Sequence, residues 1–229
     1  MLAVHLILVL WKITLRNFFK QAQNPHNKYC GDFFMSIAFV LGNGVSRKDI
    51  SLTALAQCGR IYGCNALHRE HVPDVLVSTD RPIAEHIQHS GYSATHRFYT
   101  RRPLPGLGAQ PIPKPYFGFS SGPVAVGLSA VDGHRRIYLL GFDLGPSPEK
   151  TINNLYAGTE FYKPQGATPT FTGNWIRQLV QIMREHRQVR FTRVHGPTTA
   201  HVPQFDDVPN LSRLDLAVFL TRINNKKDL

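Results

Sequence analysis

Two glycines and a hydroxyl side chain follow directly on an apolar run, a combination that could hold a phosphate group. The run covers residues 37–41, and the turn after it carries Gly42, Asn43, Gly44 and Ser46. Glycines let the backbone approach a ligand closely, while main-chain amides and the start of the next helix can donate to an anion. The turn therefore points to a nucleotide-type ligand, although it also suits a plain strand-to-helix connection. Its spacing matches neither the dinucleotide fingerprint nor the P-loop.

Three further polar residues follow directly on apolar runs, namely Asn65, Asp80 and Asp143. In a parallel α/β sheet, ligands bind beyond the carboxyl ends of the strands, so these positions and the glycine turn together predict an active-site rim. Each residue also has a structural alternative. Asn65 or Asp80 could cap a helix, and Asp143 could stabilise its loop.

The elements that must position these residues alternate between strands and helices. Apolar, β-branched and aromatic runs predict strands over residues 36–41, 60–64, 74–78, 96–100, 137–140 and 189–194, the last of them as the final strand. Helical spacing and start signals predict helices over residues 47–58, 82–91, 120–133 and 173–187, the third of them capped by a serine hydroxyl. Residues 102–115 predict an extended loop without helix, and one more apolar segment covers residues 214–220.

This alternation predicts the fold class α/β, with a mostly parallel sheet covered by helices on both faces. A chain of 229 residues can form one sizeable core, which we place over residues 35–229 as a single Rossmann-like three-layer domain. Residues 144–172 are rich in Gly, Pro, Asn and Thr. A segment of that length without regular structure predicts a long lid or binding loop.

The charge balance favours anionic partners. The formal net charge is +11 and the pI is about 9.9. The basic residues are scattered, and no basic run is interleaved with aromatic residues as a nucleic-acid surface would be. A basic enzyme acting on an anionic substrate explains the charge at least as well as nucleic-acid binding does. The sequence also leaves a homo-oligomer open.

The cysteines and histidines predict no metal site. Cys30, Cys58 and Cys64 cannot all pair and form no Cys-x-x-Cys unit, which favours a reducing, cytoplasmic location. Two histidine pairs could each share a helix face: His68 with His71, and His86 with His89. No acidic cluster accompanies either pair, so rim histidines are the preferred interpretation and no cofactor is expected.

The first 34 residues differ from the rest of the sequence. Residues 2–11 are almost wholly apolar, and basic residues punctuate the stretch that follows. Ten apolar residues are too few to cross a bilayer, and the segment lacks the basic start and cleavage site of a signal peptide. A membrane-surface anchor remains open. Because Met35 directly precedes the first strand, residues 1–34 could equally be a dispensable extension.

Several short motifs occur in an order that resembles a known group. The turn Gly42-Asn43-Gly44-Val45-Ser46 is followed by Cys64-Asn65, then Ser121-Gly122, and then an apolar run that ends in Gly141-Phe142-Asp143. This order resembles the bacterial sialyltransferases of the Campylobacter type. It is also similar to the phosphate-handling Rossmann-like proteins related to the archaeal hydroxymethylpterin pyrophosphokinase. Both groups have proline where this sequence has Val45.

The resemblance implies transfer of a sugar from an activated nucleotide donor such as CMP-sialic acid. The glycine turn and Asn65 would then contact the donor nucleotide, and Ser121 with Gly122 its phosphate or sugar. Lid tyrosines would donate to the departing phosphate, where negative charge grows in the transition state. Tyr156 and Tyr162 are the tyrosines of the predicted lid.

The acceptor hydroxyl of such a reaction needs a general base. In the sialyltransferases the base is a histidine late in the lid, but residues 166–174 contain no histidine here. Glu160, Asp143, His195 or His201 could take its place, and the spacing does not select among them.

Two alternatives stay open. A Mg²⁺-dependent phosphotransferase is implied by the likeness of residues 73–80 to the Pro-Asp…Asp segment of the pyrophosphokinase-like group, with Asp80 holding the metal against nucleotide phosphates. A non-catalytic protein that binds a nucleotide or nucleic acid would also retain a phosphate site without a base.

Overall fold

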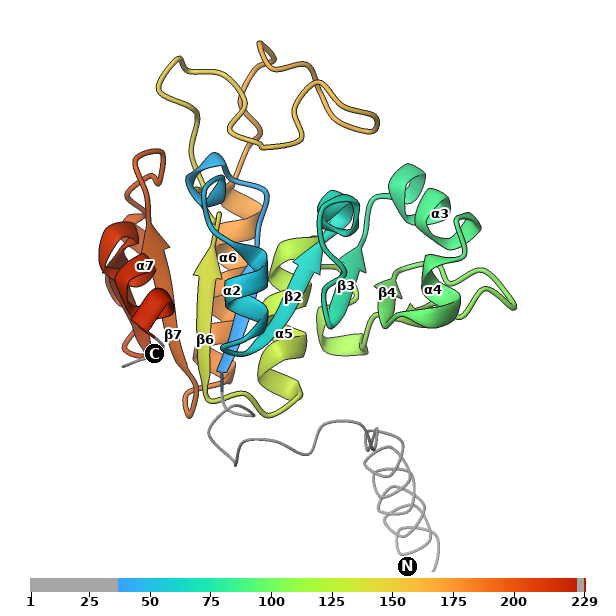
Figure 1. Ribbon diagram of the computed structural model, residues 1–229, viewed down its shortest axis with the longest axis horizontal. Coiled ribbons are helices and arrows are strands. Elements are labelled where there is room, and N and C mark those ends of the chain that lie inside the picture. Colours follow the sequence, from blue (N-terminus) through green and yellow to red (C-terminus); the bar gives the residue numbers. More distant parts are fainter. Residues whose placement is uncertain (1–36, 226–228) are drawn as a thin grey trace, which may run out of the picture. The chain divides into compact units, whose positions relative to one another are not determined.

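The structure is a computed structural model that describes residues 37–225 and 229. These residues form one α/β unit built on a single eight-stranded sheet (Figure 1). The strands are β1 (Ile37–Leu41), β2 (Arg60–Cys64), β3 (Val75–Ser78), β4 (Phe98–Thr100), β5 (Gln110–Pro111), β6 (Arg136–Leu140), β7 (Arg190–His195) and β8 (Leu211–Asp215). All neighbouring strands run parallel, in the order β5-β4-β3-β2-β1-β6-β7-β8. The predicted extension over residues 1–34 lies outside the described residues.

Helices cover both faces of this sheet. They are α2 (Leu52–Ala56), α3 (Arg81–His89), α4 (Tyr92–Thr95), α5 (Ser121–Val131), α6 (Gly173–Glu185) and α7 (Leu216–Asn225), with short 3-10 helices η2 (Val45–Arg47), η3 (Asn65–Arg69), η4 (Lys114–Tyr116) and η5 (Pro203–Phe205). Helices α5 and α6 pack on one face, and α2, α3 and α7 on the other. Figure 1 shows α2 and α7 in front of the strands and α5 and α6 behind them. This arrangement confirms the three-layer, Rossmann-like fold predicted from the sequence.

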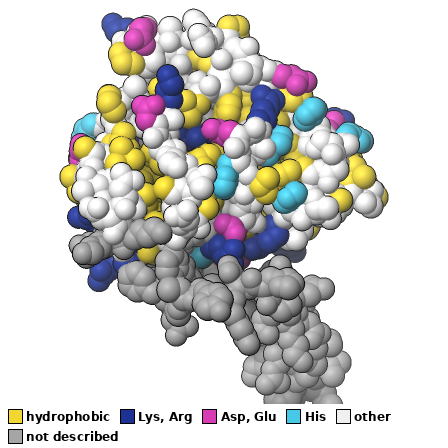
Figure 2. All heavy atoms as spheres, viewed as in Figure 1, with side chains coloured by type: hydrophobic (Ala, Val, Ile, Leu, Met, Phe, Trp, Pro, Cys, Tyr) yellow, Lys and Arg dark blue, Asp and Glu magenta, His cyan; other side chains and the backbone are white. Residues whose placement is uncertain are grey.

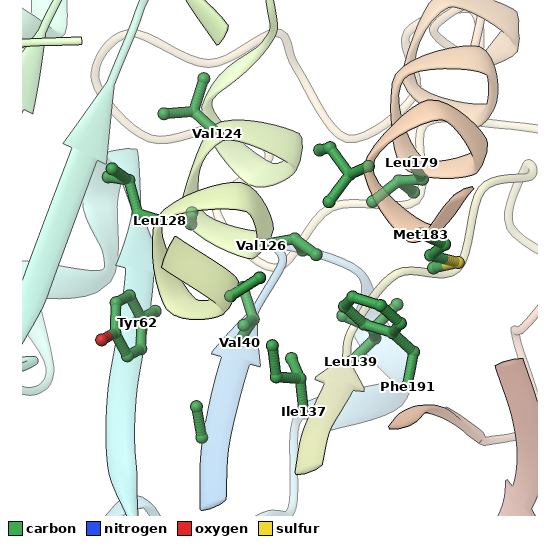
Figure 3. Close-up of a cluster of buried hydrophobic side chains, with 14 of the residues drawn as sticks. Val40, Tyr62, Val124, Val126, Leu128, Ile137, Leu139, Leu179, Met183 and Phe191 are labelled. Atoms are coloured by element: carbon green, nitrogen blue, oxygen red, sulfur yellow. The ribbon is translucent and has the colours of Figure 1, made fainter. Parts of the chain in front are cut away.

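The central strands are apolar throughout because both of their faces are buried. In β1, Ala38 and Val40 belong to the core under α5 and α6, whereas Ile37, Phe39 and Leu41 belong to the core on the opposite face. All of these side chains are at most 1% exposed. Figure 3 shows the first core, with the side chains of the sheet pointing toward those of the two helices. A parallel sheet covered on both faces requires such continuous apolar runs.

The strand order reverses between β1 and β6. The chain passes from β1 outward through β2, β3 and β4 to β5, then returns through α5 to place β6 on the other side of β1. At this switch point the connections leave the sheet in opposite directions, which opens a crevice at the carboxyl ends of the two strands. Leu41 and Leu140 are paired in the register of β1 and β6, so the turns that follow them lie side by side.

The sequence prediction is wrong at both edges of the sheet. Strand β7 is not the last one, because β8 follows it, and the predicted apolar segment 214–220 is divided between β8 and α7. In β8 no residue is buried, so the strand lacks the apolar run that marks a central strand. Within residues 102–115, the two-residue edge strand β5 is likewise exposed, and η4 begins at Lys114.

A long loop leaves the carboxyl edge of the sheet after β6. Residues 141–172 contain neither helix nor strand, as predicted for residues 144–172, and Figure 1 shows this segment beyond the ends of the strands. Within residues 37–225, no helix has the length and apolar character needed to cross a membrane.

Candidate functional site: a cavity at the switch point

A cavity of about 420 Å³ lies at the carboxyl edge of the sheet, beside the switch point. Its walls are the turns after β1 and β6, the start of α5 and part of the long loop, and its volume is typical of a ligand site. The predicted residues that line it are Gly42, Asn43, Gly44, Asn65, Asp80, Ser121, Gly122, Asp143 and Tyr162. Ser46, Tyr156 and Glu160 do not line it, and neither do the alternative bases His195 and His201.

Four of the five main-chain amides over residues 42–46 are already used inside the protein. The amides of Gly42, Gly44, Val45 and Ser46 donate to protein oxygens at distances between 2.8 and 3.0 Å. The helix after the turn, η2, is a 3-10 helix of three residues and provides no regular α-helical N-terminus. The expected cradle of free amides for a phosphate is therefore not formed at these four positions.

The two glycines instead allow the turns after β1 and β6 to touch. A β-carbon added to Gly42 would lie 2.5 Å from the main-chain oxygen of Gly141, and one added to Gly44 would lie 2.5 Å from Cγ of Asp143. Neither distance is compatible with a side chain unless the backbone or Asp143 moves. The two glycines are therefore explained by the close packing of the cavity wall, without a contact to a ligand.

Asp143 holds this wall together. Its carboxylate accepts hydrogen bonds from the amide of Ser46 at 3.0 Å, from Oγ1 of Thr198 at 2.7 Å and from Oγ1 of Thr199 at 3.2 Å, and the Ser46 hydroxyl also donates to it. The buried guanidinium of Arg193 donates to the main-chain oxygen of Asp143 at 2.9 Å. A carboxylate that accepts so many hydrogen bonds and is only 3% exposed has the structural role that the sequence left open.

The start of α5 offers donors that the glycine turn does not. Ser121 and Gly122 occupy the first turn of this 11-residue helix, where main-chain amides have no acceptor within the helix. The predicted serine cap is wrong, because Ser120 occupies the N-cap position without a side-chain hydrogen bond. The Ser121 hydroxyl instead accepts from the amide of Thr79 at 2.9 Å and donates to Oδ1 of Asn65 at 3.0 Å. An anion in the cavity would meet the positive end of this helix.

Asn65 is held in a strained conformation at the end of β2. Its φ is +51°, in the left-handed region, and its side chain links Ser121 to Asp80, to which Nδ2 donates at 3.4 Å. Leu144 and Phe161, with φ of +55° and +69°, also line the cavity. Backbone strain of this kind persists where the surrounding structure enforces it, often at functional sites.

Tyr162, a tyrosine of the long loop after β6, lines the cavity. Its hydroxyl oxygen accepts from Nδ2 of Asn43 and from the amide of Ala66, both at 3.2 Å. Burial raises the pKa of Tyr162, so the phenol keeps its proton. Both contacts use the oxygen as acceptor, and no acceptor for the hydroxyl proton is found among the described residues, so this proton is available to a ligand.

Tyr156 anchors the loop away from the cavity. Its hydroxyl donates to Glu70 and accepts from Nη2 of the buried Arg47 at 2.9 Å, while Nε of Arg47 donates to the oxygen of Gly42 at 2.6 Å. The amide of Leu155 donates to the oxygen of Asn43 at 2.8 Å. This part of the loop is therefore tied to the turn after β1.

The predicted general bases do not occupy the cavity as usable groups. Glu160 is exposed and does not line the cavity, and its main-chain oxygen accepts from Arg69 at 3.2 Å. His195 and His201 do not line the cavity. Asp80 is the carboxylate in the cavity wall whose oxygens can accept further hydrogen bonds. Among the described residues, it accepts only the 3.4 Å contact from Nδ2 of Asn65. Asp80 also occupies the N-cap position of α3 without capping it.

The cysteine and histidine side chains offer no nucleophile or metal site here. Burial raises the pKa of the Cys64 thiol to about 12, so it stays protonated at neutral pH. Nδ1 of His68 donates to the main-chain oxygen of Asn65 at 3.0 Å, and burial lowers the pKa of His68. In the part of the chain that the structure describes, no three His, Cys, Asp or Glu residues are gathered where they could hold a metal ion.

Sequence reasoning missed several lining residues. Thr79 follows β3 directly and could have been found by the same rule that selected Asp80. Trp175 and Lys163 also line the cavity, but they come from the first turn of α6 and from the loop, where no strand end marks them.

Known proteins give no further guidance on this cavity, because no protein-family model, no curated protein and no solved structure matches this chain.

Proposed function

We propose that this chain is a nucleotide-sugar-dependent transferase, sialyltransferase-like, that moves a sugar from a CMP-type donor to an acceptor hydroxyl. The observation that carries the proposal is the Tyr162 hydroxyl, which lines the cavity with two donors on its oxygen and its own proton uncommitted. A phenol in this state is a hydrogen-bond donor for an oxygen that gains negative charge. The leaving phosphate of a nucleotide sugar is such an oxygen.

In this proposal the donor lies across the switch point. Its phosphate meets the first amides of α5, at Ser121 and Gly122, and Tyr162 donates to the phosphate oxygen that leaves. Asn43 acts indirectly, since its Nδ2 orients the Tyr162 hydroxyl. The loop over residues 144–172 acts as the lid that brings Tyr162 into place, with Tyr156 as its anchor.

Asp80 is the group best placed to act as general base. It lines the cavity, it is exposed enough to meet an acceptor, and its carboxylate oxygens are not saturated. In the reaction, the bond between the anomeric carbon and the phosphate oxygen breaks, and that oxygen keeps the electron pair. The acceptor oxygen forms the new bond to the anomeric carbon and loses its proton to Asp80.

A binding screen with the full chain tests the proposal. We expect CMP or CDP to raise the melting temperature, in EDTA as well as in Mg²⁺, and UDP, GDP and ATP to do so less. Tyr162→Phe and Asp80→Asn should retain CMP binding but lose turnover of a CMP-sugar, each by a factor of about 10² or more. Asp207→Asn, an exposed carboxylate away from the cavity, is the matched control. Absence of any cytidine-nucleotide binding would refute the donor assignment.

The unsaturated carboxylate of Asp80 also favours a second candidate, a Mg²⁺-dependent phosphotransferase. Carboxylate oxygens are suitable ligands for Mg²⁺ when nucleotide phosphates and water complete its coordination. This function predicts that a purine nucleotide binds only with Mg²⁺ and that Asp80→Asn abolishes this binding. Binding of CMP without turnover would instead favour a non-catalytic nucleotide-binding protein. The cytoplasmic location expected from the cysteines stays part of the proposal.

A further inference from the structure

A second cavity, of about 320 Å³, adjoins the first one. It lies at the carboxyl ends of β3 and β4 and at the start of α3. The two cavities have Thr79 and Asp80 in common, so these residues form the wall between them. The second cavity is otherwise lined mainly by charged side chains: Arg81, Glu85, Arg101 and Arg102.

The arginines of this cavity are not neutralised in the same way. Arg81 forms an ion pair with Glu85 through a contact of 2.7 Å. Arg101 donates to the main-chain oxygens of residues 117, 118 and 119 at 3.2, 3.3 and 2.9 Å, and forms no ion pair within the described residues. Arg102 is exposed, and its guanidinium forms no ion pair in that part of the chain either. Within the described residues, two guanidinium groups of this cavity thus have no ion-pair partner.

The surrounding backbone adds to this positive field. Helix α3 has nine residues and begins at the cavity, with Arg81 in its first turn and Asp80 at its N-cap position. Because the Asp80 side chain does not cap the helix, the first amides of α3 are not satisfied by it. Three arginines against two carboxylates, Asp80 and Glu85, leave the lining with one net positive charge.

The charged side chains that line this cavity are few, namely three arginines and two carboxylates. On the face shown in Figure 2, Lys and Arg side chains lie at separate places with Asp and Glu side chains between them. A polyanion such as nucleic acid is held by a continuous track of basic side chains. A confined pair of guanidinium groups suits instead a single carboxylate or phosphate group, which arginine can bind through two parallel hydrogen bonds.

We propose that the second cavity binds one anionic group, a carboxylate or a phosphate, of a second substrate, with Arg101 and Arg102 as its ligands. Its assignment as the acceptor site rests on the proposed transferase function. The shared wall explains why the two sites would work together. An acceptor whose anionic group is bound in the second cavity presents a hydroxyl to Asp80. The donor, bound in the first cavity, reaches Asp80 from the other side of the shared wall.

Calorimetric titration of the full chain with sugars that differ only in charge tests this proposal. We expect glucose 6-phosphate or glucuronate to bind and neutral glucose not to bind, with the stronger of the two anions identifying phosphate or carboxylate as the natural group. Raising the salt concentration should weaken the binding. Equal binding of glucose and the two anions, or no binding of either anion, would overturn the proposal.

Variants locate the site. Arg102→Gln removes one of the two proposed ligands and should weaken anion binding at least fivefold. Because the Arg102 side chain is exposed, its replacement need not disturb the fold. Arg101→Gln should act in the same direction, although it also releases the main-chain oxygens of residues 117–119. Arg187→Gln removes the same charge from an exposed position beyond α6 and should leave binding unchanged. An equal loss in Arg187→Gln would mean that net charge alone attracts the anion and would refute the site.

A parallel titration with CMP separates this inference from the proposed function. If CMP does not bind but Arg102→Gln abolishes anion binding, the anion site stands and sugar transfer from a CMP donor is wrong. If CMP binds equally to the native chain and to Arg102→Gln while no anion binds to either, the donor site stands and the anion site is wrong.

Discussion

The replacement Asp143→Asn should destabilise the protein far more than Asp80→Asn, although both aspartates line the same cavity. Asp143 is 3% exposed and accepts four hydrogen bonds from one amide and three hydroxyls. Asparagine has the same shape but offers one acceptor oxygen and carries no charge. If its oxygen replaces Oδ2, the Ser46 amide and Thr198 keep their acceptor, whereas the other two hydroxyls must rotate to accept from the amide group.

The loss can be worked from these contacts. All four hydrogen bonds lose the assistance of the negative charge, and two are reversed. The buried guanidinium of Arg193, whose pKa burial lowers to about 10, also loses a favourable neighbouring charge. Since a hydrogen bond to a charged group contributes about 1.5–3 kcal/mol and a neutral one about 1 kcal/mol, we expect a loss of about 3 kcal/mol in the free energy of unfolding. For a chain of this size that corresponds to a fall in melting temperature of roughly 6–12 °C.

Equilibrium unfolding in urea measures this difference, with melting temperature as a second readout. Asp80→Asn should change the free energy of unfolding by less than about 0.5 kcal/mol, because its carboxylate has one long contact and is exposed. Equal stability of the Asp143→Asn variant and the native chain would show that the carboxylate does not hold the two turns together. The structural assignment of Asp143 would then be wrong, and its predicted catalytic role would be open again.

Three further replacements have defined outcomes. Tyr162→Phe removes the acceptor of two donors at the cavity, so urea unfolding should show a loss of about 1–2 kcal/mol in the free energy of unfolding; no loss would mean that these hydrogen bonds contribute nothing. Gly44→Ala places a β-carbon 2.5 Å from Cγ of Asp143, so the melting temperature should fall by several degrees, and an unchanged value would contradict the close approach of the turns. Burial lowers the pKa of His186, and the charge of Glu185 partly offsets this shift. Below about pH 6.5 the unfolded chain therefore binds more protons than the folded one, so the free energy of unfolding decreases as the pH is lowered. His186→Gln should flatten this dependence in urea unfolding measured at several pH values, and an unchanged slope would assign it to other groups.

The central strands could be predicted because burial on both faces makes their sequences continuously apolar. Residues 137–140, for example, were identified as a strand and form most of β6. The edge strands could not be predicted by the same signal. Strand β8 pairs with β7 through the main chain, in a register that runs from Phe191 with Leu211 to His195 with Asp215. Its side chains are exposed or half-buried. Such a strand leaves no apolar run in the sequence.

The position of the cavity was predictable, but the hydrogen bonding of its residues was not. The rule that ligands bind beyond the ends of parallel strands selected Asn65, Asp80 and the glycine turn, and of these Asn65, Asp80, Gly42, Asn43 and Gly44 line the cavity. The fate of Asp143 depends on Thr198 and Thr199, which are more than 50 residues away in the sequence. No local pattern can reveal a contact of that kind, and the same holds for the loop segment that occupies the amide of Val45.

The polar groups around the cavity divide into two classes by how far the protein itself satisfies them. Asp143 and four amides of the glycine turn are satisfied by long-range partners, so they build the wall and have little left to offer a ligand. The Tyr162 proton, the Asp80 carboxylate and the first amides of α5 are only partly satisfied. A folded chain rarely leaves groups in that state unless water or a ligand completes them. In the proposed function the chemistry therefore belongs to the second class, on the α5 side of the switch point and not at the glycine turn.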